Sequence, residues 1–414
     1  MNALFRAAWM VVSSTPVFLV SLMFWAVVII VGYLYSRIAA NERKLYGVTF
    51  NRTRLQLPGA TLQGLVGGLL ASLLMVLVGV TVSPQDLTYI WILSLLLAAV
   101  QTRLICFSYS AGFVSIASIL LGWPRVSVPG LLALVAVLHI TESLLIAISG
   151  WQTASPTTVE NRRRETVGGF LLQRFWPVPF FALVVSAAGP AGGGGVSMPA
   201  WWPLIPPAGF AAAELTTTIT PVVAALGYGD LAVTLPPQAK SRASARNLAI
   251  YSVTLLALAV LSSHYPAFGL LAAIFSPVGH ELVVIIGSRR EVTDPPLLAQ
   301  TEHGLTVLAV VPGSIAAAAG LRSGDIIAAV NDTPVLRAGD IAEAMLPRWP
   351  GMEFRVLREG EEVILRATPW EGAPLGIVPV PEPDKPEESQ LVVKRQTALA
   401  ALVEKLLYKS GMRR

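Results

Sequence analysis

The segment with the most suggestive chemistry is Pro277 to Val284, where a histidine stands directly before a glutamate. A helix that hydrolyses peptides with zinc carries two histidines one turn apart, with the glutamate between them as the base. His280 and Glu281 supply half of this pattern, but the second histidine position is Val284. We therefore expect no catalytic residues here, and a helix end at which His280 and Glu281 pair with each other or with neighbouring loops.

The run Gly227-Tyr228-Gly229-Asp230 suggests two other chemistries, ion selection and proteolysis by paired aspartates. A potassium filter needs a hydroxyl-bearing residue before its first glycine, where this chain has Ala225 and Leu226. An aspartyl protease needs a second carboxylate. The other aspartate of the apolar region is Asp86, which we expect on the opposite side of the membrane. The run is therefore predicted to be a glycine-rich end of a membrane span.

Ionisable residues within apolar segments are costly, so each is a candidate functional residue. The candidates are Arg103, His139, Glu142, Glu214, Asp230, His280 and Glu281. His139 and Glu142, three residues apart, can touch on one helix, and with Glu214 or His280 they could form a metal cluster. A buried hydrogen-bonded pair that fixes helix packing is the interpretation we favour. We expect no metal and no other cofactor.

The composition is that of a membrane protein. Of the 414 residues, 54% are hydrophobic and 13% are charged, against roughly 25% charged in an average soluble domain. The single cysteine, Cys106, excludes an internal disulfide and a zinc site built on several thiolates. The net charge of +5 lies in short loops between apolar runs, which indicates membrane orientation rather than nucleic-acid binding.

About nine apolar runs are long enough to be considered helical spans, and together they define a transmembrane domain over residues 1–290. They are Val17–Ser36, Ala60–Val82, Leu87–Ile105, Phe107–Gly122, Pro129–Ser149, Val178–Ala191, Ala208–Leu226, Leu248–Leu261 and Ala267–Ile286. Phe107–Gly122 and Leu248–Leu261 are short, and either could be tilted, re-entrant or fused with a neighbour.

The loops between these runs predict the orientation, because cytoplasmic loops carry an excess of Lys and Arg. Basic residues follow alternate spans: Arg37, Arg43, Lys44, Arg52 and Arg54; Arg162, Arg163, Arg164 and Arg174; Lys240, Arg242 and Arg246; Arg289 and Arg290. The opposite loops contain only Arg125. We expect a multi-pass protein of the cell membrane with its N-terminus outside and everything after Arg290 in the cytoplasm.

The fold class predicted for the whole chain is a polytopic α-helical membrane domain followed by a small α+β domain and a C-terminal amphipathic helix. Alternating strands and turn signals place the small domain at residues 291–380. A proline-rich linker at 381–389 and a basic helix at 390–414 follow it. The helix is expected to lie on the anionic inner leaflet, to dock a partner or to be plainly solvated.

The stretch Gly304 to Asn331, with its strand, Pro312-Gly313-Ser314 turn, alanine-rich helix and Gly324-Asp325 pair, resembles a PDZ domain of the bacterial type. The resemblance implies a groove in which a peptide adds a strand beside a helix. The predicted groove residues are Gly304, Leu305, Val307, Ile341 and Met345. The glycine-rich carboxylate loop of such domains is loosely matched by Glu302 to Leu305.

The order of these parts resembles the MinJ-type topological determinants of cell division in Gram-positive bacteria. The motifs that carry the resemblance are Arg43-Lys44, Arg103–Tyr109, Leu138–Glu142, Val167–Phe170, Phe175–Pro177 and Ser276–Glu281. It implies a scaffold that links a coiled-coil protein of the DivIVA type to the membrane ATPase MinD. It brings no catalytic residue with it.

Two classes of function remain, an interaction scaffold and a membrane-embedded enzyme or transporter. The scaffold is favoured because the chain offers a peptide-binding module and no complete catalytic set. The alternatives are an inactive homologue of the site-2 intramembrane proteases and a small-molecule transporter with broken spans at Pro221, Gly227 and Pro266.

Overall fold

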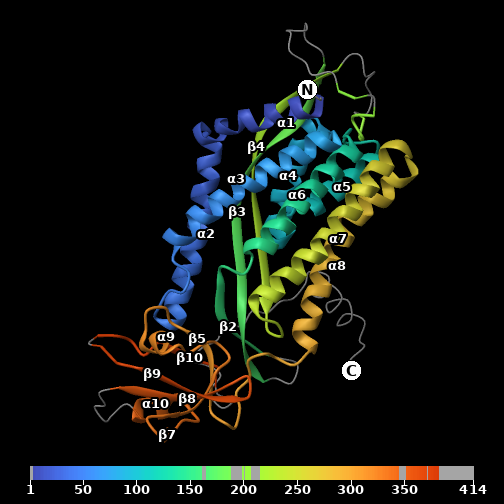
Figure 1. Ribbon diagram of the computed structural model, residues 1–414. Helices are drawn as coiled ribbons and strands as arrows, with labels where there is room; N and C mark the ends of the chain where they lie inside the picture. Colours follow the sequence, from blue (N-terminus) through green and yellow to red (C-terminus); the bar gives the residue numbers. More distant parts are fainter. Residues whose placement is uncertain are drawn as a thin grey trace, which may run out of the picture.

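The computed structural model describes residues 3–160, 165–187, 198–199, 201–206, 215–344, 351–370 and 372–381. An elongated bundle of apolar helices carries a small mixed domain at one end, and the N-terminus lies at the other end (Figure 1). The predicted linker beyond Pro381 and the predicted helix at 390–414 lie outside the described residues.

The bundle is helical, as predicted. Its helices are α1 (Ala3–Ser14), α2 (Leu22–Tyr46), α3 (Thr53–Val78), α4 (Pro84–Val100), α5 (Phe107–Leu121), α6 (Val128–Ser149), α7 (Pro237–His264) and α8 (Ala267–Thr293), with the short 3-10 turns η1 (Thr15–Val20) and η2 (Thr102–Ile105). By length and composition, six described helical segments could cross a membrane: Ala3–Val20, α2, α3, α6, α7 and Ala267–Glu291 of α8. The weak span at Leu248–Leu261 is thus part of one long helix, α7.

Helices α4 and α5 form a short hairpin. They contain 17 and 15 residues, so each is only about 25 Å long or less. Asp86 in the first turn of α4 accepts the backbone N–H of Ser127, the residue that caps α6, at 3.3 Å. The start of α4 therefore lies beside the loop that leaves α5, and the hairpin enters and leaves at the same end of the bundle. Residues 101–106 form its tip.

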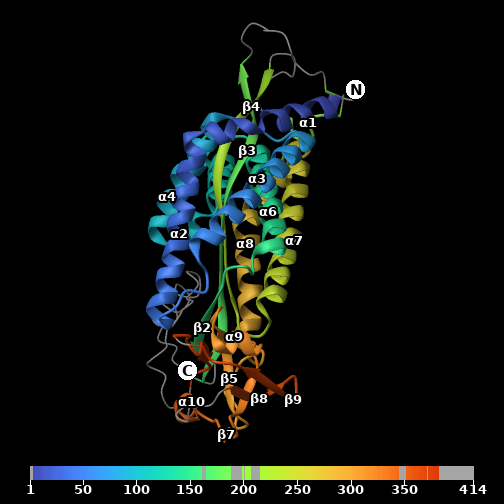
Figure 2. The ribbon, with the colours of Figure 1, turned by 60° about the vertical axis from the view of Figure 1, so that its left-hand side comes forward.

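Two predicted helical spans are wrong in the part that the structure describes. Val178–Ala191 and Ala208–Leu226 contribute to β3 (Thr166–Ala187) and β4 (Leu215–Ala232), an antiparallel pair in register from Phe170↔Ala232 to Ala187↔Leu215. This long pair runs beside the helices along the bundle (Figures 1 and 2). β2 (Ala154–Glu160) and β1 (Thr81–Val82) also pair with β3.

Proline explains why these apolar runs are strands. Pro177 and Pro179 in β3 and Pro221 in β4 would each interrupt a helix. Threonines at 216–218 add β-branched side chains that favour extended backbone. A short continuous apolar run fits a buried strand as well as a buried helix, so hydrophobicity alone could not separate the two.

Helix α3 packs on β3 at backbone contact. A Cβ on Gly64 would lie 2.0 Å from the Pro177 carbonyl oxygen, and a Cβ on Gly68 would lie 1.7 Å from that of Pro179. One turn further, the hydroxyl of Ser72 accepts the N–H of Phe181 at 2.8 Å. Glycine at i and i+4 therefore gives α3 the flat face on which the strand lies.

Two residues that we assigned to basic cytoplasmic loops lie elsewhere. Arg174 is in β3 and is 1% exposed; its guanidinium donates to the side-chain oxygens of Gln56, Gln63 and Gln152 at 2.6, 3.0 and 3.1 Å. Lys240 is 3% exposed at the start of α7, where it pairs with Glu291 of α8 at 2.9 Å. Both serve to hold the bundle together rather than to face a lipid headgroup.

The small domain has the predicted α+β character. Its elements are β5 (Leu305–Val310), α9 (Ile315–Ala319), β6 (Ile326–Val330), β7 (Thr333–Pro334), α10 (Ala338–Ala344), β8 (Met352–Arg358), β9 (Glu361–Ala367) and β10 (Ile377–Pro379). The strand order is β10-β5-β6-β8-β9, with β7 on β6.

The small domain is joined to the long sheet of the bundle by backbone bonds and apolar contacts. The N–H of Gly168 in β3 donates to the Leu298 carbonyl at 2.9 Å, and the N–H of Leu297 donates to the Val233 carbonyl at 2.8 Å. Leu298 and Val380 then pack in one apolar cluster with Phe170 of β3. The domain is thus seated on the ends of β3 and β4 (Figure 2).

The glycine contact between α3 and β3 can be tested with two alanine substitutions in the same helix. Gly68→Ala should destabilise the protein by about 1–3 kcal/mol, because the new methyl group meets backbone rather than a flexible side chain. Gly59→Ala is the matched control, since its Cβ would find only the Arg174 Nη2 at 3.9 Å; helix propensity should make this variant neutral or slightly more stable. Thermal unfolding of the two variants in nanodiscs measures the difference, and equal melting temperatures would contradict the contact.

Candidate functional site

The predicted peptide-binding strand is not at the edge of its sheet. β5 pairs with β6 on one side and with β10 on the other, and Leu305 and Val307 are each 0% exposed. Gly304 lies against the backbone of Ile327, with space for no Cβ. These three predicted groove residues are therefore core residues, and an added strand cannot pair with β5 because both of its edges are occupied.

Within the described residues, the outer strands of this sheet are β10 and β9, and β10 is the one that lies next to the predicted peptide-binding strand β5. The carbonyl of Gly376, just before β10, accepts the N–H of Val311, the residue after β5, at 2.8 Å, and Ile377 lies opposite Val310. Bonded and non-bonded pairs alternate along an antiparallel ladder. The N–H and C=O of Ile377 therefore point away from β5, towards the open side.

The loop before β10 is fixed and offers free donors. The N–H groups of Ile315 and Ala316 at the start of α9 donate to the carbonyls of Pro374 and Leu375 at 3.1 and 3.0 Å. Gly376 adopts φ +77°, and a Cβ there would overlap Ser314. Within the described part of the chain, the N–H groups of Leu375 and Gly376 have no acceptor. These N–H groups are suited to a carboxylate or carbonyl oxygen of a peptide.

This loop, Pro374-Leu375-Gly376-Ile377, is a candidate functional segment that sequence reasoning missed. Its apolar-Gly-apolar pattern before a short strand was the available signal, and it stands about seventy residues after the segment to which we assigned the loop. Leu375 and Ile377 pack on the apolar cluster that contains Ile341 and Ala344 of α10. The predicted helix residue Ile341 belongs to the same core cluster, whereas Met345 lies outside the described residues.

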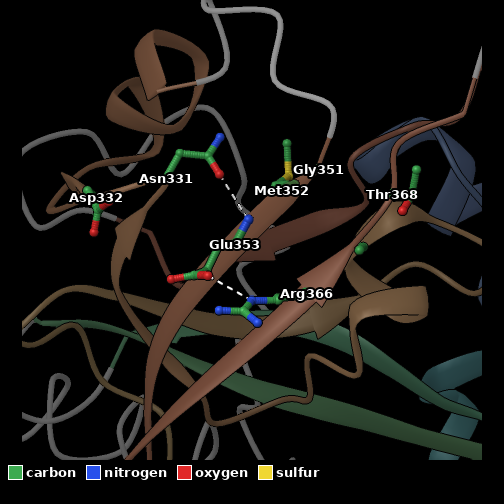
Figure 3. A pocket seen from close by; sticks show the side chains of 8 residues that line it. Asn331, Asp332, Gly351, Met352, Glu353, Arg366 and Thr368 are labelled. Atoms are coloured by element: carbon green, nitrogen blue, oxygen red, sulfur yellow. Dashed lines mark hydrogen bonds and ion pairs between the residues drawn. The ribbon is translucent and has the colours of Figure 1, made fainter.

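A separate open hollow lies on the far part of the same sheet. It is lined by Asn331, Asp332, Gly351, Met352, Glu353, Arg366, Ala367 and Thr368. Figure 3 shows the polar groups of its floor bonded to each other: the Asn331 side chain accepts the Glu353 N–H at 2.9 Å, and Arg366 pairs with the Glu353 carboxylate at 2.8 Å. These contacts hold β8 to β9 and to the turn after β6.

Five of the seven predicted polar residues gather at the tip of the α4–α5 hairpin: Arg103, His139, Glu142, His280 and Glu281. Arg103 pairs with Glu281 of α8 at 3.1 Å, and His139 lies 3.9 Å from Glu142 on α6. The rings of His139 and His280 are 5.4 Å apart between centroids. Of the two expectations for His280 and Glu281, the structure shows contacts with a neighbouring loop: His280 lies against Cys106 and Glu281 pairs with Arg103.

The sixth predicted polar residue, Asp230, lies at the other end of the bundle. Its carboxylate accepts the Ser244 hydroxyl at 2.7 Å and lies 3.6 Å from Lys240. Asp86 caps α4 at the opposite end through the Ser83 N–H at 2.8 Å, so the two aspartates do not form a catalytic pair. The seventh, Glu214, lies outside the described residues.

Two comparisons with known proteins concern the small domain and the chain as a whole. The family model of the PDZ domain matches residues 306–347. The chain is 25% identical over 360 residues to the cell division topological determinant MinJ of Bacillus subtilis (strain 168), a match that covers 80% of this chain and 84% of that protein. The protein is thus a membrane protein with a PDZ domain, and it is similar over most of its length to a topological determinant of cell division.

Proposed function

We propose that the protein is a membrane-anchored scaffold that captures an extended segment of a partner protein along β10 and thereby helps to place the division machinery of a Gram-positive bacterium. The observation that carries the proposal is the edge at Ile377, which no described strand pairs with, beside a fixed loop whose Leu375 and Gly376 N–H groups have no acceptor among the described residues. An extended peptide adds to such an edge through main-chain bonds, while pockets for alternate side chains supply specificity.

The position of the small domain supports its role in recruitment. Basic residues are found at the ends of helices that lie beside it: Arg43 and Lys44 in the last turn of α2, Arg52 at the start of α3, and Arg290 in the last turn of α8. Excess Lys and Arg marks the cytoplasmic side. The binding edge would then face the cytoplasm, where division proteins assemble.

The similarity to MinJ suggests which partners to test. We propose proteins of the DivIVA and MinD types as the partners, together with the lipid bilayer in which the bundle is embedded. The function is non-catalytic in this proposal: Val284 of α8 stands where a zinc protease needs its second histidine, and Asp230 and Asp86 lie at opposite ends of the bundle.

Replacing Ile377 by proline tests the edge, because proline removes the outward-facing N–H. The I377P protein in nanodiscs should bind a purified DivIVA-type or MinD-type partner at least about tenfold more weakly, corresponding to about 1.4 kcal/mol. Ile377→Val keeps the N–H and should bind like the wild type. Biolayer interferometry measures both, and circular dichroism checks that each variant is folded.

Wild-type affinity in the proline variant would show that β10 is not the binding strand. If the wild-type protein binds neither type of partner, the proposed partners are wrong.

Cysteine labelling tests the orientation. In a Cys106→Ser background, Arg125→Cys lies in the exposed loop between α5 and α6, and Thr368→Cys lies at an exposed position of the small domain. A membrane-impermeant maleimide should label position 125 in intact cells and position 368 only after permeabilisation. The reverse pattern would place the small domain outside the cell and exclude recruitment of cytoplasmic partners.

A further inference from the structure

The tip of the α4–α5 hairpin brings three metal-ligating side chains together from three helices. Cys106 is the residue that caps α5, His139 is in the middle of α6, and His280 is in α8. Their ligand atoms all lie within 4.8 Å of one another. None of these residues takes part in the peptide-binding edge of the small domain, so their juxtaposition needs its own explanation.

We propose that Cys106, His139 and His280 bind a thiophilic d10 metal ion, zinc(II) or copper(I), which fastens the hairpin tip to the bundle. Thiolate and imidazole are the ligands that these ions prefer. The site would be structural rather than catalytic. The ion would connect Cys106, which lies just before α5, to His139 in α6 and His280 in α8.

The distances fit a shared ion. The Cys106 Sγ lies 3.1 Å from the His139 Nε2 and 3.6 Å from the His280 Nε2. In a tetrahedral zinc site with bonds of about 2.3 Å to sulfur and about 2.0–2.1 Å to nitrogen, the sulfur and each nitrogen lie about 3.6 Å apart. To complete this geometry, the His139 Nε2 would have to move about half an ångström away from the sulfur, and the two Nε2 atoms, which lie within 4.8 Å of each other, would have to be about 3.3 Å apart.

The tautomers of both histidines are set by outer hydrogen bonds. The Nδ1 of His139 donates to the Val135 carbonyl at 2.8 Å. The Tyr109 hydroxyl donates to Glu281 at 2.8 Å, so it accepts from the His280 Nδ1 at 3.3 Å. Each histidine therefore directs an unprotonated Nε2 at the sulfur, as metal-bound histidines do when the other ring nitrogen donates to a carbonyl or an outer group.

Glu142 lies beside the cluster but is not one of the residues whose ligand atoms lie within 4.8 Å of one another, so its side chain would have to move for a carboxylate oxygen to reach the ion. The Glu142 carboxylate lies 3.9 Å from the His139 Nε2. With a thiolate and one carboxylate, a zinc(II) site is electrically neutral, which lowers the cost of burying it in an apolar bundle. The Ser108 hydroxyl, 3.1 Å from the same nitrogen, is the alternative oxygen donor on the opposite side of the cluster.

The experiment measures the metal content of the full-length protein in detergent. The protein is purified through a histidine-free tag from cells grown with zinc and copper, and inductively coupled plasma mass spectrometry then identifies the ion. We expect about one ion per chain in the wild type. Cys106→Ser and His280→Ala should each lower the content at least about tenfold.

The chain offers a matched control. His264 is an exposed histidine at the end of α7, outside the cluster, so His264→Ala should keep the wild-type metal content. Because Cys106 is the single cysteine of the chain, a thiolate-to-cobalt charge-transfer band in the cobalt-loaded wild type would assign the ligand directly. The C106S variant should lack that band while retaining a wild-type elution volume.

Without a metal, the thiol of Cys106 and the hydroxyl of Ser108 would simply donate hydrogen bonds to the two Nε2 atoms. In that case the wild type and C106S would contain equal, substoichiometric metal and no cobalt–thiolate band would form. Either result, or an equal loss of metal in His264→Ala, would overturn the proposal.

Discussion

The structure depends on one constraint: a polar group inside an apolar bundle must find its partner within the protein, because no water is there to replace it. The long strands β3 and β4 satisfy this constraint along the edge that they share, and β1, β2 and the side chains of Tyr35 and Ser72 bond to the other edge of β3. β3 is sheltered further by α3, which its glycines allow to approach the strand at backbone distance. An extended backbone is thereby held in a setting where an unpaired strand would be unstable.

The same constraint accounts for where the buried polar side chains lie. They gather where regular backbone stops or where elements cross: around the hairpin tip, around Arg174 with its three glutamines, and around Lys240 at the base of α7 and α8. Breaking such a pair leaves an uncompensated buried charge, which costs far more than a surface ion pair contributes. These buried pairs therefore hold the helices and strands of the bundle in fixed positions relative to one another.

The rigidity of the bundle also determines how the small domain is held. Val378 of β10 packs in the cluster that contains Leu298 and Phe170, so the strand that offers the free edge also touches β3 of the bundle. The edge is therefore held in a fixed relation to the membrane domain instead of hanging on a flexible linker. A bound partner would be held in a fixed position relative to the membrane domain. The conformational entropy lost on binding would then come mainly from the partner.

Local patterns predicted local structure well. The helix at Ile315–Ala319, the strand at Ile326–Val330 and the hairpin around Glu359-Gly360 follow from turn residues and alternation within a few positions. The helical spans at Val178–Ala191 and Ala208–Leu226 were mistaken because an apolar run carries no period, although Pro177, Pro179 and Pro221 were signals against a helix.

The β10 edge and the contribution of Cys106 to the cluster were missed for a different reason, which is distance along the chain, although the sequence already suggested His139 and His280 as possible members of a metal cluster. Strand β10 pairs with β5 although about seventy residues separate them, so a groove assigned to the first strand of the PDZ pattern falls on a strand that is already covered. Cys106 was set aside as a lone cysteine, and its neighbours stand 33 and 174 residues away on other helices. Spacing rules detect ligands that share one helix or one loop. A site assembled from a hairpin tip and two crossing helices has no such spacing, and only the packing of the bundle reveals it.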